Sequence, residues 1–337
     1  MKRAIDNDLI KNAKKSRASA DSLVESNKTE PLTQNIEPLS PLFNTVKKKN
    51  EEEIVITDPM LFRVSKDNKS FFLLGTNHSL SFEAFTPEVK KAMLDCEKLI
   101  LERANMDNPK KEFEDFIEGN LASILRTGTD SAQYIQLPEK EKEIVVNTLY
   151  VFKNALNKFN KDLSDLKDEI VIGAFIGVCT QISGEHSMEL DLTNAFKKMN
   201  KSIEGLEQSK DLLEQVVEFT TWMKKTDLVM AINTFNNSKN EQCENHKTYA
   251  QGSSLRKSKY NSDAIENRNA KWFTVILAEV NKSNNSLLAV GHSHLTNPGN
   301  GLLEWLENMG FNLEKCDKEA NFSPYSWKDQ KSDWRIM

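Results

Sequence analysis

The sequence predicts an α/β protein, with a central mixed β-sheet flanked by helices, a large helical insertion and a disordered polar arm at the N-terminus. Three observations predict this class. Short apolar runs alternate with helical patterns across residues 54–320, as in strands joined by crossover helices. Residues 110–200 are helical in pattern throughout, which predicts an insertion or cap. Residues 1–53 are polar and rich in Lys, Ser, Asn and Pro, so they bury too little surface to offset the entropy of ordering.

The first elements follow from local pattern. "LFRVS" (61–65) and "FFLLGT" (71–76) are short apolar runs joined by the turn-prone "KDNK", which predicts a β-hairpin. A helix follows, because Thr86 is a good N-cap, Pro87 suits the first helical position and Glu88 suits the positive helix end. "LILER" (99–103) then predicts a buried strand and completes a strand–helix–strand unit.

The later elements alternate in the same way. The region 110–200 includes one long helical stretch from about Pro138 to Phe159, and residues 321–337 are a polar C-terminal tail. The remaining predicted elements are a strand in 201–207, helices in 209–248 and 264–281, a buried strand in 286–290, a helix in 299–310 and a last strand in 311–316.

Composition excludes several classes of protein. The net charge is −5 and basic residues exceed acidic ones only in the N-terminal arm, so we expect no nucleic-acid partner. No apolar run approaches the roughly 20 residues of a membrane span, and no secretory signal is visible. The four cysteines are scattered, without a C-x-x-C pair. We therefore expect a cytoplasmic protein without a membrane partner, or alternatively one exported by a route that needs no signal peptide.

Two stretches carry the pattern of candidate chemistry. "LLGTNH" and "AVGHSH" both read as an apolar strand followed by Gly-x-x-His, and they place His78 and His294 after strand ends. Ligands of open α/β sheets bind beyond the carboxyl ends of the strands. Neutral imidazole is the commonest metal ligand in proteins, and a dication also needs an anionic partner. Glu102, at the end of the "LILE" strand, is the best local candidate.

A structural interpretation competes with this one. A single histidine after a strand is often a hydrogen-bonded structural residue, and the repeated context is what favours a shared site. His292 is expected to be structural or to support the site indirectly, and His186 and His246 are given no role. The other charged candidates are Glu189, Asp191, Glu207 and Arg268.

Four blocks in order resemble the TraB/GumN (PrgY/Tiki-like) family. They are residues 71–102 ("FFLLGTNH…LILE"), 188–215 ("MELDLTN…LLEQ"), 265–276 ("IENRNAKWFTVI") and 285–316 ("NSLLAVGHSHL…NLEKC"). The resemblance covers about residues 60–317. One departure is "MELD", where family members often carry glycine before the aspartate, which leaves the role of Asp191 open.

The resemblance implies an α/β core related to the ChaN-like and erythromycin-esterase-like folds, and a metal-dependent hydrolase, with the Tiki members acting as metalloproteases. It matches His78, His294 and Glu102 to metal ligands, with Glu102 also catalytic, and Glu207 and Arg268 to further family positions. The implied cofactor is a divalent ion, Mn²⁺ or Co²⁺ first, with Zn²⁺ or Fe²⁺ as alternatives.

Two functional hypotheses follow. In the first, the chain is a metal-dependent hydrolase, peptidase-like, acting on a peptide or protein. There Glu207 serves as a general base or supports the site from behind, and Arg268 stabilises a developing oxyanion. In the second, it is a non-catalytic peptide-binding or regulatory protein that keeps the metal site.

Overall fold

The computed structural model describes residues 54–104, 109–127, 132–181, 187–208, 227–233, 246–252, 262–280 and 285–330. The predicted arm (1–53) lies outside these residues, as does most of the predicted helical region 209–248. Within the described part, no helix has both the length and the apolar character needed to cross a lipid bilayer.

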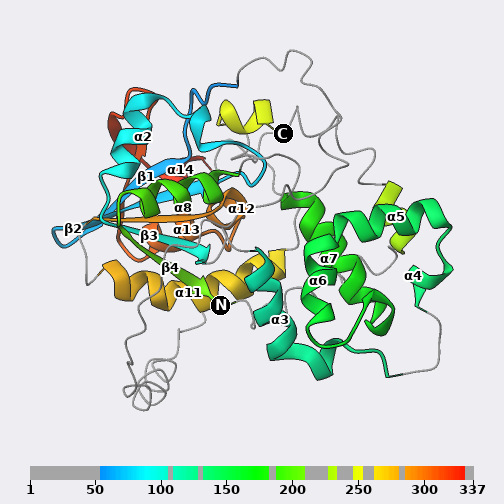
Figure 1. Cartoon of the computed structure of the whole chain (residues 1–337). Helices are drawn as coiled ribbons and strands as arrows, with labels where there is room; N and C mark the ends of the chain where they lie inside the picture. Colours follow the sequence, from blue (N-terminus) through cyan, green and yellow to red (C-terminus); the bar gives the residue numbers. More distant parts are fainter. Residues whose placement is uncertain are drawn as a thin grey trace, which may run out of the picture. The chain divides into compact units, whose positions relative to one another are not determined.

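A seven-stranded mixed sheet forms the centre of the fold, as the sequence predicts (Figure 1). Its strand order is β4-β3-β5-β2-β1-β6-β7. The strands are β1 (Leu61–Lys66), β2 (Lys69–Thr76), β3 (Lys98–Arg103), β4 (Ser202–Glu207), β5 (Ser286–Gly291), β6 (Asn312–Cys316) and β7 (Phe322–Tyr325). β4, β3, β5 and β2 run parallel, whereas β1, β6 and β7 add antiparallel pairs.

Helices cover both faces of this sheet. α2 (Pro87–Leu94) and α8 (Met188–Lys198) lie on one face, and α11 (Ser262–Val280) lies on the other (Figure 1). This division is expected from right-handed crossovers, because the chain moves outward along the sheet to β4 and then returns to β5. Thr86 caps α2 through its side chain, with Pro87 as the first helical residue, as predicted.

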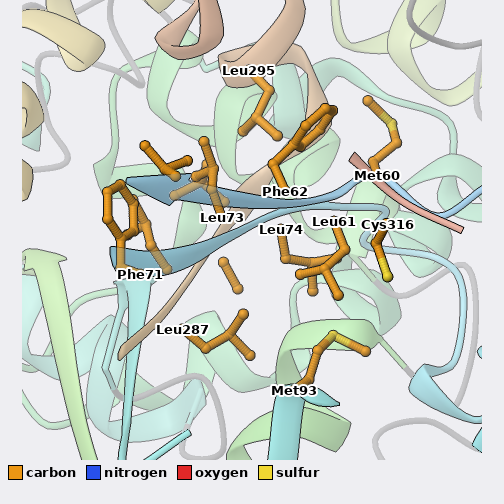
Figure 2. Close-up of a cluster of buried hydrophobic side chains, with 14 of the residues drawn as sticks. Met60, Leu61, Phe62, Phe71, Leu73, Leu74, Met93, Leu287, Leu295 and Cys316 are labelled. Carbon is orange, nitrogen blue, oxygen red and sulfur yellow. The ribbon is translucent and has the colours of Figure 1, made fainter. Parts of the chain in front are cut away.

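The sheet core is built by alternation along the strands. Leu61 and Phe62 point to opposite faces; Phe62 lies on the side of Leu295, and Leu61 on the side of Met93 from α2 (Figure 2). Leu295 belongs to the short helix α12 (His292–Thr296), and α13 (Leu302–Asn308) follows it. Both faces of the central strands are therefore buried, which explains their near-continuous apolar sequences.

A second hydrophobic cluster is built mainly from helices and comes largely from the insertion between β3 and β4. Its helices are α3 (Pro109–Ile124), α4 (Gln133–Gln136), α5 (Glu139–Thr148), α6 (Tyr150–Asn157) and α7 (Asp168–Gln181), with the short 3-10 helix η2 (Leu163–Asp165). The predicted single helix from Pro138 to Phe159 is wrong. It breaks at Leu149, whose φ of −93° and ψ of 20° end α5 and begin α6 while its side chain is fully buried.

The C-terminal prediction also needs correction. Residues 321–337 read as a polar tail, but β7 pairs with β6 and α14 (Trp327–Gln330) follows it. Trp327 is buried and its indole N–H donates to Glu304. Two aromatic anchors, Phe322 and Trp327, attach this polar segment to the core.

Candidate functional site

The candidate residues gather at one edge of the sheet, where four parallel strands end. Glu207 closes β4, Glu102 is the penultimate residue of β3, His294 follows β5, and His78 follows β2. The register pairs Thr76 with Gly291. It also pairs Leu101, the residue before Glu102, with Ala289 of β5. The structure therefore brings all five sequence-predicted site residues together, with Arg268 reaching them from α11.

The two Gly-x-x-His turns fit against each other through their glycines. A Cβ on Gly75 would lie 3.2 Å from the Cα of His292, and 3.0 Å from a methyl of Leu295, both in the second turn. A Cβ on Gly291 would lie 3.3 Å from Oε1 of Glu102 and 3.4 Å from Nε2 of His78, in the first turn. Each glycine thus leaves room for the opposite turn, and Gly291 opens the space that Glu102 and His78 border.

His294 is held rigidly from behind by α11. Its Nδ1 lies 2.8 Å from Oδ1 of Asn269, whose amide nitrogen donates to the carbonyls of His294 and Asn300. Because that amide donates, its oxygen accepts, so His294 carries its proton on Nδ1 and offers a lone pair on Nε2. The Trp272 ring lies 4.4 Å from the imidazole. Burial, followed by the nearby positive charge of Arg268, lowers the pKa of His294 to about 3.

Arg268 stands at the centre of the cluster. Its guanidinium donates to Oε2 of Glu102 at 2.6 Å and to both oxygens of Glu207 at 3.0 and 3.1 Å, and its Nη1 lies 3.0 Å from Nε2 of His294. Burial works to raise the pKa of Glu102, but Arg268 first, together with His294, His78 and the Gly291 backbone N–H, outweighs it and holds that pKa well below its usual range. Glu102 is therefore ionised, and Arg268 is a fixed cation beside it.

Glu207 supports this arrangement from the side. One of its oxygens accepts from the Trp272 indole at 2.8 Å as well as from Arg268. Both oxygens are thus engaged as acceptors, which suits a residue that positions Arg268 better than one that takes a proton from substrate. The Arg268 guanidinium carbon also stacks 4.5 Å from the centre of the Trp272 ring.

His78 has a different environment, because its side chain is 40% exposed whereas that of His294 is 7% exposed. Its Nδ1 lies 2.7 Å from Oε1 of Glu189, in the first turn of α8. The Glu189 carboxylate raises the pKa of His78 to about 9. Nε2 is the atom on the side of Gly291 and Glu102.

Sequence reasoning missed several supporting residues. Glu189 and Asp191 were candidate acids without a role, and both hold the loop that carries His78. Asp191 accepts from Ser81 and from the backbone of Phe82. No local signal could have assigned these contacts, because α8 lies more than one hundred residues beyond the loop in sequence.

Two further histidines, His246 and His292, lie beside the site as well. Nδ1 of His292 is 3.2 Å from the carbonyl of Thr76, and burial lowers the pKa of His292. His246, expected to have no role, has its Nε2 2.7 Å from the hydroxyl of Ser79, next to His78. His186 lies outside the described residues.

The family resemblance implies a metal, so the donor set must be tested against one. Across the described ranges, no three His, Cys, Asp or Glu side chains stand close enough to form a ready-made metal centre. The donors nevertheless fit a divalent ion in kind. Nδ1 of His294 is hydrogen-bonded to Asn269, as in metal-ligating histidines, and Nδ1 of His78 lies 2.7 Å from Glu189. Nε2 of His294 is 4.0 Å from Glu102, and Nε2 of His78 borders the same space beside Gly291.

Charge also fits a cation. Two nearly buried carboxylates, those of Glu102 and Glu207, pair with the single Arg268 guanidinium, which leaves one negative charge that a divalent ion would offset. The obstacle to metal binding is Nη1 of Arg268, which lies 3.0 Å from Nε2 of His294, the nitrogen that would bind the ion.

Comparison with known proteins gives two matches. The model of the TraB/PrgY/gumN family matches residues 60–315. Trophozoite exported protein 1 of Plasmodium falciparum (isolate 3D7) is 25% identical over 184 residues, which are 55% of this chain and 15% of that protein. The chain thus spans a small part of the length of that relative. No solved structure matches the chain. Because the family match covers well over half of the sequence and includes both Gly-x-x-His turns, this chain belongs to the TraB/PrgY/gumN family.

Proposed function

We propose that the chain is a divalent-metal-dependent hydrolase, peptidase-like, that acts on a peptide or protein at the edge of the sheet where β2, β3 and β5 end. One observation carries this proposal. Nδ1 of His294 is hydrogen-bonded to Asn269 and Nδ1 of His78 lies 2.7 Å from Glu189, each partner on a neighbouring helix, and both Nε2 atoms lie on the side of Glu102. Mn²⁺ or Co²⁺ are the first candidates, and Zn²⁺ or Fe²⁺ are alternatives.

His78, Glu102 and His294 would hold the metal. When bound, a divalent ion supplies a Lewis acid and lowers the pKa of coordinated water toward neutrality. The chain itself supplies the rest. Glu102 remains ionised because Arg268 stabilises its charge. His294 keeps its Nε2 lone pair because Asn269 accepts the Nδ1 proton.

Arg268 and Glu207 have separate parts in this proposal. Arg268 is a cation that needs no proton transfer to stay charged, so it can stabilise negative charge that develops on a carbonyl oxygen of the substrate. Glu207 and Trp272 fix its orientation, and Glu207 is therefore a positioning residue. For metal to reach His294, Nη1 of Arg268 must leave Nε2, and in that displaced position it would face the substrate.

The test combines metal binding with turnover. Chelator-treated protein is titrated with Mn²⁺ and Co²⁺ by calorimetry, and then incubated with a peptide library that is read by mass spectrometry. We expect one ion per chain, and cleavage that disappears on chelation. His78→Ala and His294→Ala should each weaken binding at least 100-fold. His292→Ala is the matched control, because it removes a partly buried imidazole from the second turn whose Nδ1 lies 3.2 Å from the carbonyl of Thr76.

The binding-protein alternative predicts a different pattern. Its basis is that Arg268 is already paired with Glu102 and Glu207 and need not act on a substrate. Under it the protein binds the ion and captures peptides, yet cleaves none of the library. Wild-type protein that binds no divalent ion would contradict both versions. The name of the Plasmodium relative concerns export, and export is a separate proposal for this chain, tested by following a tagged copy.

A further inference from the structure

Glu189 is a carboxylate that the fold buries at a cost. It occupies the second position of α8, after the N-cap Ser187, and its side chain is 3% exposed. A helix N-terminus favours negative charge only modestly, whereas burying a carboxylate that is not well paired is considerably more costly. The contacts of its two oxygens therefore decide what the residue is for.

Only one of the two oxygens is used. Oε1 lies 2.7 Å from Nδ1 of His78 and also accepts from the Thr76 hydroxyl. Oε2 is buried and has no hydrogen-bond partner among the side chains and backbone that the structure describes. A residue kept only for stability would be expected to satisfy both oxygens. The pairing with His78 is thus the specific feature that retains this charge.

The first turn of α8 contacts the loop that carries His78 at several points. Asp191 accepts from the Ser81 hydroxyl at 2.7 Å and from the Phe82 backbone at 3.0 Å. Sδ of Met188 lies 3.4 Å from the backbone nitrogen of Asn77. Residues on both sides of His78 are therefore fixed to the helix that carries Glu189, and the relative positions of Glu189 and His78 are set by several independent contacts.

We propose that Glu189 is a positioning residue of the site: its carboxylate, 2.7 Å from Nδ1 of His78, forms an ion pair with that side of the ring and thereby leaves Nε2 facing Glu102. The proposal rests on the proposed function for its consequence, since a partner of this kind orients a metal-ligating histidine and its loss costs about 10–100-fold in metal affinity. It is the counterpart of Asn269 behind His294, but it uses a charge where Asn269 uses an amide.

Three substitutions separate the orienting contact that Glu189 makes with His78 from its negative charge and from a general loss of stability. Glu189→Ala removes the acceptor, and we expect Mn²⁺ affinity to fall about 10–100-fold. Glu189→Gln keeps an oxygen that can accept from Nδ1, so it should recover part of that loss. Glu279→Ala is the matched control. Glu279 is also buried and hydrogen-bonded, but its partners Lys98 and Ser286 lie at the opposite ends of β3 and β5. That variant should lose stability and keep Mn²⁺ affinity.

The protonation of His78 gives a readout that a purely structural role would not change. In ¹⁵N-histidine NMR of wild-type protein, Nδ1 of His78 should carry a hydrogen-bonded proton, and Glu189→Ala should lose it. If Glu189→Ala binds Mn²⁺ as wild type does while His78→Ala does not bind, the positioning role is wrong and the proposed function stands. If wild-type protein binds no metal, the proposed function fails. In that case the NMR result alone tests the role of Glu189. Absence of a hydrogen-bonded Nδ1 proton on His78 in wild-type protein would overturn that role.

Discussion

The two Gly-x-x-His turns have the same sequence pattern and the same position after a parallel strand, yet they hold their histidines in opposite electrostatic states. His78 is half exposed beside the Glu189 carboxylate, which raises its pKa to about 9. His294 is buried against Asn269, and burial together with Arg268 lowers its pKa to about 3. The motif therefore sets where the imidazole stands, and residues from distant helices set its charge.

This difference teaches where function is encoded in the fold. The glycines and the strand ends fix the backbone of both turns, because each glycine faces the other turn. The first turn of α8 then supplies an acid, Glu189, as the partner of His78, and the middle of α11 supplies an amide, Asn269, as the partner of His294. A chain could keep both motifs and lose the site by changing either helix.

The largest expected effect on stability comes from Arg268, the cation that α11 places beside the second turn. Arg268→Ala would leave Glu102 and Glu207 buried without their partner, and removing one member of a buried ion pair costs roughly 3–5 kcal/mol. Urea unfolding measures this loss. Arg63→Ala is the control, since its pair with Glu314 is partly exposed and should contribute about 1 kcal/mol or less. Equal losses for the two arginines would contradict the central place given to Arg268.

The next largest effect on stability is expected from Asn269, the amide behind His294. Asn269 is fully buried, and Asn269→Ala would leave the Nδ1 proton of His294 and two carbonyl oxygens without partners. We expect a loss of roughly 2–3 kcal/mol in unfolding free energy, from the cost of unsatisfied buried groups. Asn285→Ala removes an exposed amide that donates to the Asp95 carbonyl and should change stability little. An Asn269→Ala protein as stable as wild type would show that the second turn is not held from α11.

Substituting Gly75 and Gly291 should separate an effect on stability from an effect on metal binding. In Gly75→Ala the new methyl meets the backbone of His292, which cannot move freely, so we expect a loss of roughly 1–3 kcal/mol from overpacking. In Gly291→Ala it meets the ends of the Glu102 and His78 side chains, so stability should change less, while Mn²⁺ affinity falls at least tenfold. Thermal unfolding and calorimetry, run on both variants, test this. Gly75→Ala weakening metal binding more than Gly291→Ala would reverse the assignment.

The smallest effect is the pH dependence of stability in chelator-treated protein. The pKa of His78 is raised from 6.5, so its contribution is fully present below pH 6.5 and is lost as pH rises through about 9. The pKa of His294 is lowered, so its contribution is present above pH 6.5 and is lost as pH falls toward 3. His78→Gln should flatten the alkaline side and His294→Gln the acidic side. The His78 effect should be the weaker one, because solvent screens a half-exposed pair.

Unfolding curves from pH 4 to pH 9 for wild type and the two variants give this comparison directly. If both variants change the same side of the profile, the two turns do not hold their histidines in opposite states.

The sequence predicted those features that depend on neighbouring residues. The hairpin of β1 and β2, the Thr86 cap with Pro87, and the strand ends that carry His78 and Glu102 all follow from local patterns. Parallel strands share one edge, so the meeting of His78 with His294 could be predicted from topology.

The features it failed to predict depend on distant contacts. The pairing of Glu189 with His78 joins two segments far apart in sequence. Leu149 breaks a helix because the helical core buries its side chain there. The polar segment after Asn321 becomes β7 and α14 because β6 offers an edge and Trp327 finds a buried position. In each case tertiary packing overrides a local preference.

The most direct measurement of the central claim is anomalous X-ray diffraction from crystals of the protein grown with Mn²⁺. We predict one strong anomalous peak between the imidazoles of His78 and His294, next to Glu102, with Arg268 turned away from His294. A Mn²⁺-soaked crystal with no peak at the ends of β2, β3 and β5, or with its only peak elsewhere in the chain, would contradict the claim that the two turns form one metal site.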